Sequence, residues 1–165
     1  MQPSTPSPIG PEQAALMTGR VSIIVGSRDG RLRPHLMRAV GCRLSADRRR
    51  VTLLVPQGGS RELLADLRAN GQIAVVFTEP SSNRTLQIKG HDAQVTACAA
   101  DDAELAERYL RGFVDEIAQL GFDAQVAHTL LGHDEERVAV HFTVAAAFDQ
   151  TPGPAAGEPL AVPQS

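Results

Sequence analysis

The stretch Gly58–Arg61, with the sequence Gly-Gly-Ser-Arg, combines residue types that could hold an anion. It precedes an amphipathic segment, and free backbone N–H groups at a helix start, a serine hydroxyl and a guanidinium can converge on one phosphate. The alternative is that Ser60 only caps the helix and that Arg61 is a solvated arginine.

A second polar set lies on the stretch Arg84–Gly90, where Thr85, Gln87 and Lys89 alternate with Leu86 and Ile88. Side chains alternate across a strand, so one face belongs to a core and the other carries hydrogen-bonding groups. The amide of Gln87 can both donate and accept along the edge of a ring. Alternatively, Thr85 and Gln87 only cover the outside of a barrel. We hypothesise that this strand and Gly58–Arg61 hold a phosphorylated planar cofactor.

Arg38 is a third candidate because it stands among apolar residues on an expected strand. A cation in such a position needs a partner, which could be a phosphate or a carboxylate of another subunit.

Apolar periodicity and turn residues predict the elements that position these residues. We expect helices at Pro11–Met17, Ser60–Asn70 and Asp101–Leu120, with a further helical turn at Asp123–Leu131. We expect strands at Val21–Val25, Pro34–Leu44, Val51–Val55, Ile73–Phe77, Arg84–Ala97 and Arg137–Phe148, with Gly90 marking a bulge or close approach. The near-continuous apolar runs Val51–Val55 and Ile73–Phe77 predict burial on both faces.

The order of these elements favours an α+β fold dominated by β structure. Consecutive strands with short turns indicate antiparallel pairing and argue against a Rossmann sheet, so a small barrel with peripheral helices is expected. The chain of 165 residues divides into an N-terminal extension (1–20), a barrel domain (21–149) and a Pro/Gly-rich tail (150–165). The tail could lie against a partner subunit near the cofactor groove or fray.

With this layout, the chain resembles the FMN-binding split-barrel family that includes pyridoxamine 5′-phosphate oxidase. The residues that carry the resemblance are Pro34, Arg38, Gly58–Arg61 and Arg84–Gly90. The resemblance covers about Val21 to Phe148 and rests on element order and short motifs. It implies a six-stranded antiparallel split β-barrel, a homodimer, and FMN in a groove between subunits.

By this resemblance, Ser60 and Arg61 match the consecutive serine and arginine that bind the flavin phosphate in the family. Arg38 matches the family's arginine on the second strand. Thr85 and Gln87 resemble the polar positions that reach the flavin ring. Two departures separate the chain from the true oxidase: Glu62 stands where that enzyme has lysine, and the C-terminal Arg/His motif and any Trp are missing.

The resemblance implies an FMN-dependent oxidoreductase acting on an unidentified small molecule, with no side chain needed as acid or base. One alternative is a non-catalytic carrier or sensor that binds flavin or haem, with His91 or His133 as the haem ligand. Another is an apo structural dimer in which Glu62 has removed phosphate binding. The catalytic residues stay unknown.

Composition argues against several other classes. The mildly acidic chain has no aromatic residue in its Arg-rich first half, which disfavours nucleic acid. No apolar run or N-terminal pattern indicates a membrane span or signal peptide, so a cytoplasmic protein is expected. The five histidines lack zinc spacing, Cys42 and Cys98 predict free thiols, and no nucleophile elbow suggests a hydrolase.

Overall fold

The structure, a computed structural model, describes residues 7–132 and 136–160. Its helices are α1 (Pro11–Met17), α2 (Arg61–Asn70), α3 (Asp102–Ala118) and α4 (Ala124–Leu131). Its strands are β1 (Ser22–Arg28), β2 (Pro34–Arg38), β3 (Cys42–Leu44), β4 (Arg50–Pro56), β5 (Ile73–Thr78), β6 (Thr85–Gly90), β7 (Gln94–Ala97), β8 (Arg137–Thr143) and β9 (Ala146–Asp149). Within this described part, no helix combines the length and the apolar content needed to cross a membrane.

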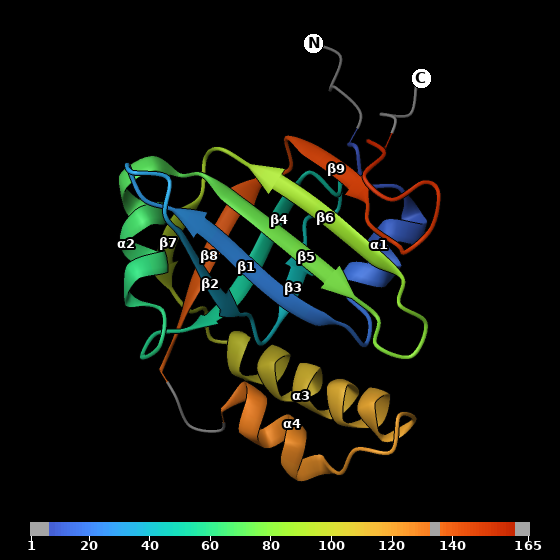
Figure 1. The fold of residues 1–165 in the computed structure, drawn as a ribbon. Helices are drawn as coiled ribbons and strands as arrows, with labels where there is room; N and C mark the ends of the chain where they lie inside the picture. Colours follow the sequence, from blue (N-terminus) through green and yellow to red (C-terminus); the bar gives the residue numbers. More distant parts are fainter. Residues whose placement is uncertain (1–6, 133–135, 161–165) are drawn as a thin grey trace.

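The strands form two antiparallel sheets (Figure 1). One sheet has the order β2-β1-β5-β6-β9 and the other the order β3-β4-β8-β7. Only three residues join β2 to β3 and two join β8 to β9, so the chain passes almost directly from one sheet to the other at both places. The β-dominated α+β class is confirmed, whereas sheets of five and four strands do not confirm the predicted count of six.

Side chains from both sheets fill the space between them. Ile23 on β1, Leu53 on β4 and Phe77 on β5 have no exposed area there. Leu54 points the other way, into a second cluster that the four-stranded sheet forms with α3 and α4, which run together below the sheets in Figure 1. Because alternate side chains of β4 face different clusters, the prediction that this strand is buried on both faces is confirmed.

Three of the predicted strands are each divided in the structure, and one of them, Arg137–Phe148, forms β8 in one sheet and β9 in the other. The run Pro34–Leu44 is interrupted where its backbone partner changes: Ala39 N donates to Ile23 O in one sheet, and Val40 N donates to Leu54 O in the other. The run Arg84–Ala97 is interrupted after Gly90, where a Cβ would lie 2.5 Å from the ring of Phe142. The predicted close approach at Gly90 is therefore confirmed.

One face of the five-stranded sheet is left uncovered by the described helices, none of which passes in front of β1, β5 and β6 in Figure 1. On this face Ile24 and Val76 are only half-buried, and Leu36 is 69% exposed. The prediction that Ile73–Phe77 is buried on both faces is therefore wrong for a single chain. We call this surface the open face. By strand register it consists of Ser22, Ile24, Gly26, Leu36, Arg38, Ala74, Val76, Thr78, Thr85, Gln87, Lys89, Ala146 and Phe148.

Candidate functional site

Ser60 stands at the start of α2 with a buried hydroxyl that nothing described engages. The residue is 1% exposed, its side chain does not cap the helix, and its Oγ has no hydrogen-bond partner among residues 7–132 and 136–160. Burying an unsatisfied hydroxyl costs about 1–3 kcal/mol. Arg61 follows, exposed and without a hydrogen bond or ion pair to any described residue. The positive end of α2 thus offers two polar side chains to an anion.

Packing brings this turn against the edge of β2. A Cβ on Gly59 would lie 2.5 Å from Cε of Met37. Arg38 follows Met37 and projects to the opposite face of the strand, because successive side chains alternate. The start of α2 and the open face therefore meet along the edge of β2.

A buried carboxylate fixes α2 in this position. Asp66 Oδ2 accepts a hydrogen bond of 2.7 Å from Ser27 Oγ on β1 and lies 2.7 Å from His35 Nδ1 on β2. One turn of α2 is thereby held to two strands. The sequence analysis missed this group, since its three members are far apart in the chain and share no motif.

Arg38 lies half-buried on the open face, as its candidate role requires. Its Nη1 donates a 2.7 Å hydrogen bond to Ser22 Oγ, and no carboxylate in the described part of the chain forms an ion pair with it. A neutral hydroxyl does not neutralise the guanidinium charge, so the two partners considered from the sequence, a phosphate and a carboxylate of another subunit, both stay predictions.

Thr85 and Gln87 project from β6 onto the same open face. Thr85 Oγ1 donates to Thr78 Oγ1 at 3.2 Å, and Gln87 Oε1 accepts from Gln150 Nε2 at 3.4 Å. Gln150 was missed as a site residue because the sequence placed it in the tail. The direct run from β9 into Gln150 is the signal that could have found it, because β9 pairs with β6.

The register places Arg38 and Gln87 in one row across the sheet. Arg38 stands opposite Ile24, Ile24 opposite Val76, and Val76 opposite Gln87. Three strand spacings separate the two polar ends by about 14 Å, with an apolar floor between them. The structure thus brings Arg38, Thr85 and Gln87 to one surface, and Ser60 and Arg61 to its β2 edge, while no described hydrogen bond joins the two groups.

Of the two histidines considered for haem, the structure describes only His91. His91 is exposed, with Nδ1 2.9 Å from Gln72 Oε1, and His133 lies outside the described residues. In the described ranges, no group of three or more His, Cys, Asp or Glu side chains could hold a metal ion.

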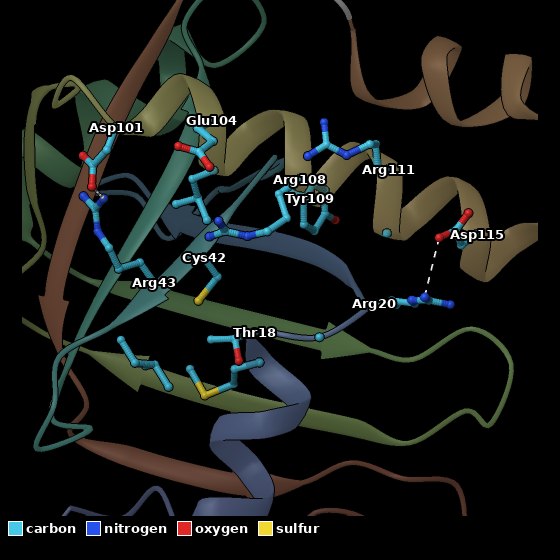
Figure 2. Close-up of a pocket in the computed structure, with 15 residues that line it drawn as sticks. Thr18, Arg20, Cys42, Arg43, Asp101, Glu104, Arg108, Tyr109, Arg111 and Asp115 are labelled. Atoms are coloured by element: carbon cyan, nitrogen blue, oxygen red, sulfur yellow. Dashed lines mark hydrogen bonds and ion pairs between the residues drawn. The ribbon is translucent and has the colours of Figure 1, made fainter.

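A separate hollow of about 620 Å³ lies beside α3, lined by side chains that the sequence analysis did not assign to a site (Figure 2). It does not contain any of the five predicted cofactor residues.

No protein-family model and no curated protein sequence matches the chain. Solved structures with a similar fold include HupZ from Group A Streptococcus, with a TM-score of 0.55, 15% identity, and coverage of 90% of this chain and 99% of that one. An F420 reductase has a TM-score of 0.57 at 13% identity, covering 84% of this chain and 98% of its own. A proposed pyridoxamine 5′-phosphate oxidase from Lactobacillus delbrueckii has a TM-score of 0.53 at 12% identity, covering 85% and 93%. The chain therefore has the fold of the pyridoxamine 5′-phosphate oxidase-like proteins, as the resemblance in its sequence led us to expect.

Proposed function

We propose that the chain is an FMN-binding member of this family and that it holds the FMN phosphate at the start of α2. The observation that carries the proposal is the buried hydroxyl of Ser60, without a described partner, beside Arg61. A phosphate monoester would accept hydrogen bonds from both side chains and from the first-turn N–H groups of α2. Arg38 would supply a second cation from the edge of β2.

The flavin ring would lie across the open face. Ile24 and Val76 give a half-buried apolar floor of the kind that aromatic rings cover. Because Gln87 Oε1 accepts from Gln150, the N–H groups of the Gln87 amide are left to donate to a ring carbonyl. Thr85 would add a hydroxyl at the same edge.

We further propose a homodimer in which a second copy of the chain covers the open face. Leu36, Ile24 and Val76 leave apolar surface exposed in one copy, and contiguous apolar surface of this kind is typical of an interface. A second copy would also bury β5 on both faces, which is what its apolar sequence favours. Counting β2–β3, β6–β7 and β8–β9 each as one bent strand gives the six-stranded split barrel expected for such a subunit.

The proposed activity is an FMN-dependent oxidoreduction of a small molecule. Bound FMN would supply the hydride or electron transfer, while the chain binds the phosphate, orients the ring and excludes water from it. The substrate class, the electron donor and the cytoplasmic location stay predictions.

The binding proposal is tested by titrating the purified full chain with FMN and with riboflavin, which lacks the phosphate, and following flavin fluorescence. We expect Arg61→Ala to weaken FMN binding about tenfold, the worth of one charge-assisted hydrogen bond, and to leave riboflavin binding unchanged. Arg68→Ala, in the last turn of the same helix, is the control and should bind FMN as the unmodified chain does.

Equal affinities for FMN and riboflavin in the unmodified chain would reject the phosphate site. They would favour the hypothesis that Glu62 has removed phosphate binding. An absorption band of haem in the purified protein would instead support the haem-binding alternative. If FMN binds but a reduced nicotinamide does not bleach its colour under anaerobic conditions, a reduced nicotinamide is not the electron donor of this protein.

A further inference from the structure

The hollow beside α3 has the size and lining of a ligand site. It lies between the end of α1, the strand β3 and one side of α3 (Figure 2). Its volume, about 620 Å³, falls in the range of small-molecule sites, about 300–1,000 Å³. Met17, Cys42 and Leu105 give it an apolar base, since all three are buried. We call it the α3 cavity.

Ion pairs occupy the charged side chains at its two ends. Arg43 Nη1 is 2.7 Å from Asp102 Oδ1 and 3.4 Å from Asp101 Oδ2 at the β3 end. At the other end, Arg20 Nη2 is 3.5 Å from Asp115 Oδ2, the pair joined by the long dashed line in Figure 2. These side chains neutralise one another and leave little charge to attract a ligand.

Arg108 and Glu104, between those ends, are the two charged lining residues that have no ion pair or hydrogen bond with a described residue. Both are accessible to solvent, so a ligand can reach them from outside. They stand four residues apart on α3, a spacing that puts their Cβ atoms about 6 Å apart on one face of the helix. In Figure 2 the guanidinium of Arg108 extends toward β3, above Cys42, with the carboxylate of Glu104 above it.

We propose that the α3 cavity binds a small zwitterion with an apolar body, such as a free amino acid or a short peptide. Its carboxylate would pair with Arg108 and its ammonium group with Glu104, while the body would cover Met17 and Leu105. A simple anion would satisfy Arg108 but place a like charge beside Glu104, and a simple cation would do the reverse. A zwitterion satisfies both.

This site is independent of the proposed flavin site. Tyr109 on α3 lines the cavity, and its hydroxyl donates a 2.7 Å hydrogen bond to the carbonyl of Val21, the residue before β1. None of the residues assigned to FMN lines the cavity. Substitutions of Arg108 or Glu104 should therefore leave FMN affinity unchanged, and Arg61→Ala should leave zwitterion binding unchanged.

The test uses three probes that share a phenylethyl body and differ in charge: 3-phenylpropionate, phenylalanine and 2-phenylethylamine. Their binding to the full chain is measured by ligand-observed NMR at low ionic strength. We expect phenylalanine to bind about tenfold more tightly than either other probe, since one more charge-assisted pair is made. Circular dichroism of each variant verifies that it is folded.

Variants then assign the two charges. Arg108→Ala should weaken phenylalanine about tenfold, and Glu104→Gln should weaken phenylalanine while tightening 3-phenylpropionate. Glu158→Gln, which changes an exposed acid outside the cavity lining, is the matched control and should change neither. Tighter binding of 3-phenylpropionate than of phenylalanine, equal phenylalanine affinity in all variants, or no saturable binding of any probe up to about 10 mM would each overturn the proposal.

Discussion

Gly90→Ala should destabilise the fold strongly, because Gly90 on β6 packs directly against β8 of the other sheet. The added Cβ would lie 2.5 Å from Phe142 Cδ2 and 2.9 Å from Thr143 O. Carbon atoms in contact are ordinarily about 3.5–4.0 Å apart, so about 1 Å of space must be made. Phe142 is only 1% exposed and cannot turn toward solvent. Overpacking a core typically costs about 1–3 kcal/mol, and a backbone oxygen as second obstacle places this case near 3 kcal/mol.

The assay is urea unfolding of the unmodified chain and the variant at one pH and one protein concentration, with the slope compared as well as the midpoint. Gly30→Ala is the matched control. A Cβ there meets nothing within 4 Å and the residue has no positive φ, so the control should be neutral or slightly stabilising. Should Gly90→Ala come within about 0.5 kcal/mol of Gly30→Ala, far below the expected overpacking cost, the described approach of β6 to β8 is not the packing of the protein in solution.

Three further perturbations test other parts of the structure. Asp66→Ala should lower the free energy of unfolding by about 2 kcal/mol, because Ser27 and His35 lose a buried acceptor. Asp115→Ala, which breaks only an exposed ion pair, is the control. Equal losses of unfolding free energy in the two variants, measured by urea unfolding, would contradict the reasoning. Burial raises the pKa of the Cys42 thiol to about 12, so iodoacetamide at pH 8 should alkylate it about 100-fold more slowly than the exposed Cys98, as followed by mass spectrometry of the native chain; comparable rates would place Cys42 outside the core. Burial, with help from Arg43 and Arg50, lowers the pKa of His141, so the unfolded chain binds the proton more readily and stability should fall as the pH drops below about 6.5. His141→Gln should lose less stability between pH 7 and pH 5, and an identical loss would assign the dependence to other groups.

The sequence by itself determined the order and type of the secondary-structure elements. The spacing of the apolar residues on α3 and the alternation on β6 are local patterns, and local patterns follow directly from helix and strand periodicity. The same patterns placed Thr85 and Gln87 on the polar side of their strand. They also placed Ser60 in front of a helix, where its chemistry could be considered before any packing was known.

Only the tertiary structure decided which of these residues meet. The register between strands set Arg38 and Gln87 in one row, and the packing of α2 on β2 buried the Ser60 hydroxyl. Three other features also depend on segments distant in the chain. They are the division of Pro34–Leu44 between two sheets, the contact of the Asp66 carboxylate with β1 and β2, and the α3 cavity. Such contacts depend on close packing among many side chains at once, and a one-dimensional pattern carries the period of each element but not the register or the angle at which two elements meet.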